Sequence, residues 1–495
     1  MLDSVSSLNQ SKWKIFWVIS TIIIVVATAN IGVFFDITLQ IFLLLSAIIV
    51  ATTILLWTNQ KSLRYAGILL LIAPYQGVLG LFSSLLPNII TIIIVGLYFI
   101  KYSKTDIFRQ LSKTPIVTLT KTFIFAVIIS YIWSLRYSVD ALGLIDVGQK
   151  VTLLLLLLIF AAALDEKQNI TKLFGFYAFG VGTFTILSAV DFYLGLNLLG
   201  KYAQIDPANV LIDWGSIDST RIGLYRLRGI GFSMAINRMA LWIGFAAIWS
   251  FGCGQISTRT KAMLYYLLGL AFMLSLLATG SRSGIIGSIL GIVVLLLHKL
   301  SFKRAVVVFL ITGAIFVVSA FIIPGDFLRA RFNLSELSEG GGRVLPWKVA
   351  IQIFLENPVF GVGPLGYSRT FTNLDFSQYF TASADPHNAL LELLSQKGLV
   401  GTIPFVLLVL YGFYYIFIVK IKEQDLKPWI GTIRGLSISA VFICSFNTYQ
   451  YERIIWFLLA WIVIVGKQTK KNPIPTSRST NGTYYSQVWL QSRKL

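Results

Sequence analysis

Two residue types in this chain have side chains suited to chemistry at one site: a histidine and a group of arginines. His387 stands in the stretch ADPHNALLELLSQKGLVG, residues 384–401, and is one of only two histidines in the sequence. A neutral imidazole can accept a proton near pH 7. An arginine guanidinium holds phosphate or carboxylate with two parallel hydrogen bonds. Together they predict a proton acceptor close to a site for an anionic ligand.

The residues around His387 predict a short helix. Asp385 can cap free backbone N–H groups, and Pro386 is tolerated at a first helical position. Leucines at 390, 391, 393 and 394 supply an apolar face, and Gly398 is a suitable stop. We therefore expect His387 in the first turn, where the helix dipole favours a neutral ring and attracts phosphate. A capping or packing role is the commoner one for an isolated histidine, and it stays open here.

The elements that must position these residues are membrane-spanning helices. Hydrophobic residues make up 56% of the chain and charged residues 13%, and the mean hydropathy is +0.77. These values predict an all-α integral membrane protein with about twelve to fourteen transmembrane helices, since some runs are shorter than the ~20 residues of a straight span. The first run lacks a cleavage site and predicts a signal anchor. The candidate spans are residues 14–35, 37–57, 65–84, 88–102, 119–136, 149–164, 172–195, 234–252, 262–279, 282–298, 304–323, 399–419, 430–447 and 453–466.

The charges predict how these spans are oriented. With a cytoplasmic N-terminus, most of the 41 Lys and Arg residues fall on the inside, as the positive-inside rule requires, and both termini are cytoplasmic. This topology explains most of the net charge of +20, so no nucleic-acid partner is expected. Cys253 and Cys444 fall at opposite faces and cannot pair within one chain.

The same reading divides the chain into four parts. Residues 1–323 form an N-terminal and central bundle with a medium outside loop at about 196–233. Residues 324–398 form a large outside loop with short helices, residues 399–466 the last transmembrane helices, and residues 467–495 a basic, disordered cytoplasmic tail. His298, the other histidine, falls at the inside end of a span.

Among the positive charges assigned to the outside, arginine outnumbers lysine, whereas lysine predominates inside. Topology needs only a charge, so the preference for arginine indicates an anionic ligand outside. The alternative for any single arginine is a salt bridge or a contact with lipid headgroups. The outside arginines that bear on a site are Arg226, Arg228, Arg282 and Arg343.

Three motifs follow one another along the segments that are assigned to the outside face. ATGSRSGIIGSILG, residues 278–291, places Arg282 at a membrane boundary. GGRVLPWKVAIQIFLENPVFGVGPLGY follows a span and a loop later, and then come His387-Asn388 and Gly398-x-x-Gly401. This order resembles the O-antigen ligase and O-antigen polymerase superfamily. RLRGIGFSMAINRMALW, from Arg226, is similar to the arginine-and-glycine stretch of that family, although Ala-Ile-Asn replaces its Asn-Pro-Asn at 235–237.

The resemblance implies transfer of a glycan from a polyprenyl-diphosphate carrier to a glycan or lipid acceptor at the outer face of the inner membrane, with the lipid bilayer as a further partner. His387 would take the acceptor proton, and direct attack would invert the anomeric centre. Fixed arginines would stabilise the diphosphate leaving group without a metal, and we expect no cofactor, because the chain has no paired-carboxylate or His/Cys metal motif. The diphosphate is assigned to Arg282, Arg226 and Arg228, and supporting or acceptor-binding roles to Arg343, Asp385, Asn388 and Trp347.

Ligase and polymerase differ only in their acceptor, and both stay open, with ligase slightly favoured. The expected location is a bacterial inner membrane with the site on the periplasmic side. A cavity open laterally to lipid, rich in arginine and with His387 at its rim, should admit the isoprenoid tail. The rival function is transport of a small anion such as bicarbonate, which requires ionisable residues at mid-membrane depth or interrupted helices.

Overall fold

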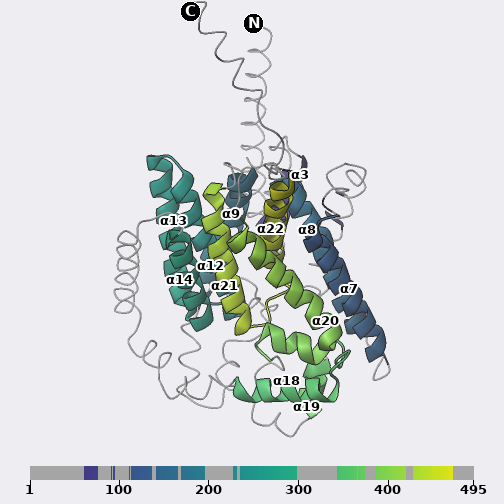
Figure 1. Ribbon diagram of the computed structural model, residues 1–495. Helices are drawn as coiled ribbons and strands as arrows, with labels where there is room; N and C mark the ends of the chain where they lie inside the picture. Colours follow the sequence, from purple (N-terminus) through teal and green to yellow (C-terminus); the bar gives the residue numbers. More distant parts are fainter. Residues whose placement is uncertain are drawn as a thin grey trace, which may run out of the picture.

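Helices are the only regular secondary structure in the described part of the chain. The computed structural model describes residues 61–75, 91, 93–94, 98, 111, 113–135, 141–165, 169–194, 227–230, 235–297, 343–364, 366–373, 386–419 and 427–471, and no strand occurs among them (Figure 1). The α-helices are α3 (Lys61–Ile72), α7 (Pro115–Ser134), α8 (Ala141–Leu164), α9 (Asn169–Leu194), α12 (Ile236–Ile256), α13 (Arg259–Thr279), α14 (Arg282–Leu297), α18 (Val344–Glu356), α19 (Gly366–Asn373), α20 (Ala389–Phe413), α21 (Ile430–Ser445) and α22 (Arg453–Lys471). Short 3-10 helices at Ala73–Tyr75 and Lys427–Trp429 and a π-helical turn at Tyr414–Ile418 complete the set.

Seven helical segments within the described ranges are long and apolar enough to cross a membrane. They are Pro115–Ser134, Val147–Leu164, Asn169–Asp191, Ile236–Ile256, Arg259–Thr279, Ala389–Ile418 and Lys427–Ser445. Two shorter apolar helices, Tyr65–Tyr75 and Arg282–Leu297, accompany them. The predicted class, an all-α multi-pass membrane protein, is thus confirmed. The predicted spans at 14–35, 37–57 and 304–323, and most of 88–102, lie outside the described residues.

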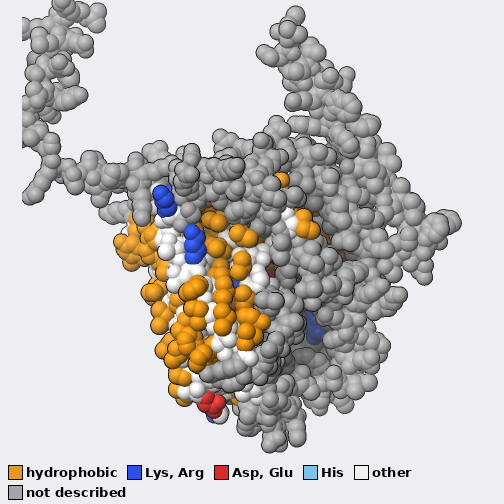
Figure 2. Space-filling view, turned by 90° about the vertical axis from the view of Figure 1, so that its right-hand side faces the viewer, with side chains coloured by type: hydrophobic (Ala, Val, Ile, Leu, Met, Phe, Trp, Pro, Cys, Tyr) orange, Lys and Arg blue, Asp and Glu red, His pale blue; other side chains and the backbone are white. Residues whose placement is uncertain are grey.

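The surface of the helices is suited to lipid. Figure 2 shows a broad band of hydrophobic side chains on one face, with basic side chains above it and acidic ones below. Phe125 and Ile132 of α7 and Leu407 and Leu410 of α20 are among the large apolar side chains that stay exposed. Such exposure would be unfavourable in water, and a bilayer removes that cost.

Small residues allow the central helices to approach closely. A Cβ added to Gly284 of α14 would lie 2.5 Å from the Cβ of Ala240 in α12, and one added to Gly287 would lie 2.7 Å from the Ile443 side chain in α21. Gly291 is similarly close to the backbone oxygen of Gly435, 2.7 Å from the added atom. This is the packing role of small residues in membrane helices.

The described part of the bundle has two distinct ends. One carries α18 and α19, short helices that do not qualify as spans, and we call it the loop end (Figure 1). At the opposite end the Lys467 amine of α22 contacts the carboxylate of Asp165, which follows α8, at 2.9 Å. Because α13 runs from one end to the other, its first residue Arg259 and the turn at Gly280 lie at opposite ends.

Candidate functional site

The start of α20 is capped by Asn388. Its side-chain oxygen accepts a hydrogen bond from the Leu391 amide at 3.0 Å, which satisfies a free N–H of the first turn. The helix begins at Ala389, so the expectation that His387 lies in the first turn is wrong. His387 precedes the cap and has a φ of 50°, a left-handed conformation that is uncommon for residues with a Cβ. Asp385, the predicted cap, lies outside the described residues.

Gly398 interrupts α20 without ending it. Its φ of 59° and ψ of −164° are not helical, and the helix resumes at once. Hydrogen bonds attach the loop after α18 to this break. The Leu399 amide donates to the Pro358 carbonyl at 2.8 Å, and the Val362 amide donates to the Ser395 carbonyl at 3.0 Å. A Cβ on Gly398 would lie 2.6 Å from the backbone nitrogen of Gly361. The sequence predicted a helix end at Gly398, and the structure has a break at which the loop after α18 is attached to α20.

Arg282 is fixed by the turn between α13 and α14. Gly280 ends α13 with a φ of 60°. The Ser281 hydroxyl accepts a hydrogen bond from the Gly284 amide at 3.3 Å and donates one to the Asn237 side-chain oxygen at 2.7 Å. Arg282 follows as the first residue of α14, so it lies at a helix N-terminus at the loop end.

The charge of Arg282 acts on Arg343. Arg343 immediately precedes α18, and its guanidinium carbon is 5.6 Å from the centre of the Phe446 ring. Burial lowers the pKa of Arg343, the positive charge of Arg282 lowers it further, and Tyr449 partly opposes this. Two guanidinium groups that repel each other in a partly buried setting favour an anion between them.

The structure also describes Arg228 and Trp347, two further residues that were predicted for the site. The Leu227 amide donates to the Ala278 carbonyl at 2.9 Å, which attaches the segment with Arg228 to the last turn of α13. Burial lowers the pKa of the Arg228 guanidinium. Trp347 is half-buried one turn after Arg343, and its indole nitrogen has no partner among the described residues. Arg226 lies outside the described residues.

Three consecutive residues at the end of α21 join these separate segments. The Ser445 carbonyl accepts a hydrogen bond from the Asn388 amide nitrogen at 2.9 Å. The Arg343 guanidinium lies over the Phe446 ring, and the side-chain amide nitrogen of Asn447 donates a hydrogen bond to the Ser283 hydroxyl at 3.0 Å. Residues far apart in the sequence, near 282, 343 and 388, therefore converge at residues 445–447.

The sequence did not predict this role for the residues between α21 and α22, FNTYQYE, which we call the 446–452 connection. Tyr449 of this connection is only 9% exposed, and its ring centre is 5.9 Å from the Arg238 guanidinium carbon. The available signal was a run of polar and aromatic residues between two apolar spans, which is also typical of an ordinary outside turn.

The 446–452 connection also contacts three further helices. The Glu452 carboxylate forms a 2.8 Å salt bridge with Arg238 of α12. The amine of Lys150, a buried residue of α8, lies 3.6 Å from the centre of the Tyr451 ring. Gln450 donates a hydrogen bond to Glu392 of α20.

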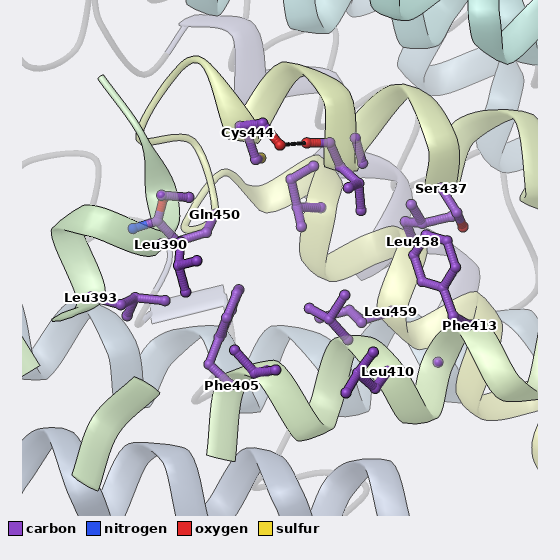
Figure 3. A pocket seen from close by; sticks show the side chains of 18 of the residues that line it. Leu390, Leu393, Phe405, Leu410, Phe413, Ser437, Cys444, Gln450, Leu458 and Leu459 are labelled. Carbon is purple, nitrogen blue, oxygen red and sulfur yellow. Dashed lines mark hydrogen bonds between the residues drawn. The ribbon is translucent and has the colours of Figure 1, made fainter. Parts of the chain in front are cut away.

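An apolar cavity of about 330 Å³ begins beside this junction, between α20, α21 and α22. In Figure 3, Gln450, Leu390 and Leu393 lie at one end, and Phe413 and Ser437 lie at the other. Its polar lining residues are Asn388, Ser437, Ser445 and Gln450. The expectation of an arginine-rich lining is wrong for this cavity, since no arginine is among the described residues that line it.

The described residues offer no cluster of three or more His, Cys, Asp or Glu side chains that could hold a metal ion. The chemically useful groups at the loop end are guanidinium, amide and hydroxyl groups of the segments that converge at residues 445–447. This arrangement suits an anionic substrate that carries an apolar chain.

Comparison with known proteins gives one family. No curated protein matches the chain. Residues 264–406 match the family model described as O-antigen ligase, a range that includes Arg282, Arg343, His387 and Asn388. Over these residues the chain is therefore similar to the O-antigen ligase family.

Proposed function

We propose that this protein transfers a glycan from a polyprenyl-diphosphate carrier to an acceptor hydroxyl at the periplasmic face of a bacterial inner membrane. Family membership implies glycan transfer of the ligase or polymerase type from a lipid-linked substrate. The location, the direction of insertion and the acceptor belong to the proposal, as does the assignment of residues 324–398 as the large outside loop.

The observation that carries the proposal is the convergence at residues 445–447. Asn388, the neighbour of His387, contacts Ser445, and Arg343 lies over Phe446. The charge of Arg282 in turn lowers the pKa of Arg343. A candidate base and two candidate diphosphate ligands thus occupy one small region of the loop end.

The reaction assigns a separate task to each group. The acceptor oxygen attacks the anomeric carbon, and the His387 imidazole takes the acceptor proton. The bond from that carbon to the diphosphate oxygen breaks, and its electron pair leaves on the polyprenyl diphosphate. Arg282 and Arg343 stabilise this developing charge, with Arg228 and Arg226 as further ligands. Attack from the side opposite the leaving group inverts the anomeric centre.

The apolar cavity supports a substrate with a long hydrocarbon tail. It starts at Asn388 and Gln450 and continues between membrane-spanning helices that are exposed to lipid. An isoprenoid chain in this cavity would place its diphosphate toward the loop end. A small anion would gain little from a lining without charged side chains, so the cavity favours glycan transfer over anion transport. Trp347 and Asp385 remain proposed acceptor-side residues.

The test is the glycan profile of cells that lack the gene and receive it back as wild type or as His387→Ala. We expect that His387→Ala fails to restore the profile, because the acceptor keeps its proton. The matched control is His298→Ala, which removes the only other histidine and should restore the profile.

Each outcome identifies a function. Full-length glycan on the carrier with bare acceptors indicates a ligase, and single repeats indicate a polymerase. An unchanged profile on deletion contradicts glycan transfer and favours transport. Full rescue by His387→Ala would mean that the histidine is not the base.

A further inference from the structure

Gln450 is held at two points inside the 446–452 connection. Its side chain is 1% exposed, and its amide nitrogen donates to the Glu392 carboxylate at 2.5 Å. Its backbone carbonyl accepts a hydrogen bond from the Trp456 indole at 3.1 Å. Because only the amide nitrogen can donate to a carboxylate, the orientation of this side chain is fixed.

Glu392 lies one helical turn after Asn388, and its amide donates to the Asn388 carbonyl at 2.9 Å. The first turn of α20 is therefore attached to the α21–α22 region twice: by Asn388 to Ser445 and by Glu392 to Gln450. His387 sits directly before this doubly attached turn.

The left-handed conformation of His387 needs such support. A φ of 50° is unfavourable for a residue with a Cβ, and it persists only where neighbouring contacts over-determine it. The two attachments of the first turn are contacts of this kind. One of them, between Gln450 and Glu392, does not involve any residue assigned to binding or catalysis.

We propose that Gln450 is a positioning residue: its hydrogen bond to Glu392 sets the start of α20 and thereby aims the His387 imidazole at the acceptor. The inference rests on the proposed function. It predicts that the donor and acceptor sides of this hydrogen bond can be exchanged, because only the bond itself is needed and not a charge at position 392.

The isosteric change Gln450→Glu tests the bond directly. It places two carboxylates in contact, and they can form a hydrogen bond only if they share a proton. The contact is thus restored at low pH, where one carboxyl is protonated, and becomes repulsive at high pH, where both are charged. The elements packed around this contact carry other charged groups, and these are the same in every variant. They are His387, Lys397, Arg238, Glu452 and Arg453.

The experiment uses the full chain in proteoliposomes with a polyprenyl-diphosphate-linked glycan and its acceptor, and it compares kcat relative to wild type at each pH. We expect kcat of Gln450→Glu to fall about tenfold at pH 8 and to recover toward wild type near pH 5.5, with little change in the KM for donor. Glu392→Gln places two neutral amides in contact. Its kcat should fall less than that of Gln450→Glu, and the decrease should not depend on pH.

The exchanged double variant Glu392→Gln with Gln450→Glu decides the question, since its amide can again donate to a carboxylate. We expect it to recover most of the activity at pH 8. Wild-type activity in Gln450→Glu at every pH, or a double variant no better than Gln450→Glu, would overturn the inference. If thermal unfolding shows that Gln450→Glu is not folded, the activity of the double variant alone decides. An inactive wild type with active controls would instead contradict the proposed function.

Discussion

At the scale of single residues, the proposed diphosphate site depends on two guanidinium groups. Arg282 begins α14 and Arg343 immediately precedes α18, and the charge of Arg282 lowers the pKa of Arg343. Repulsion of this kind is unfavourable in the empty protein. A diphosphate that binds between the two groups attracts both of them and offsets the repulsion. The fork shape matters as well as the charge, because two parallel hydrogen bonds fix the phosphate orientation.

We therefore predict that Arg282→Lys loses about 10- to 100-fold in kcat/KM although it keeps the charge, because it loses one of two hydrogen bonds to the leaving group. The matched control is Arg259→Lys, an exposed residue at the opposite end of α13, which should leave the activity unchanged. Transfer rates of the two purified variants check this. Equal activities would mean that Arg282 supplies only a charge.

The sequence predicted several of these residues but not their junction. Arg282, Arg343 and Asn388 were found because arginine is unusual on the outside and because the motifs occur in a known order. The 446–452 connection was missed, since its contacts to Arg343, Ser283 and Glu392 are made across the fold and leave no local pattern. The helix start was placed at Asp385 because aspartate before proline is a strong local signal, whereas Asn388 gained the cap through its second hydrogen bond to Ser445.

At the scale of helices, the position of Arg282 depends on how closely α14 approaches α12 and α21. Hydropathy alone predicted these spans to within a few residues, since bilayer thickness fixes their length. The glycines of α14 let the helix pack closely against α12 and α21. Which helices it contacts could not be predicted, because a run of small residues does not identify its partner.

This packing yields a matched pair of alanine substitutions. In Gly291→Ala the new methyl would meet the Gly435 backbone oxygen at 2.7 Å, which cannot move away as a side chain can. We expect a loss of about 1–3 kcal/mol and a lower unfolding temperature in detergent. Gly175→Ala in α9 has nothing within 4 Å of its added Cβ and should not lower that temperature. A similar decrease in both variants would show that the loss comes from the helix backbone and not from packing.

At the scale of the whole molecule, the described helices separate two chemically different ends. The loop end carries α18, α19 and the converging arginines, and the opposite end carries the Asp165–Lys467 salt bridge. Between them lies the hydrophobic band of Figure 2. A substrate whose tail lies in lipid and whose head lies in water fits such a molecule, provided that the loop end faces the periplasm.

That orientation can be measured with two single cysteines in a Cys253→Ser, Cys444→Ser background. Val359→Cys lies in the exposed loop after α18, and Thr258→Cys lies exposed at the start of α13. A membrane-impermeant maleimide applied from the periplasm should label the first, and it should label the second only after the inner membrane is opened. The reverse pattern would place the site in the cytoplasm and contradict the proposed substrate side.

The 446–452 connection has a practical consequence for anyone who engineers this protein. A short stretch between two spans is where an epitope tag or a reporter would normally be inserted, since such turns tolerate additions. Here Asn447 and Gln450 are each only 1% exposed, and the surrounding residues are in contact with several helices. A tag inserted after Thr448 would therefore disrupt the fold, and its accessibility would report on a damaged protein.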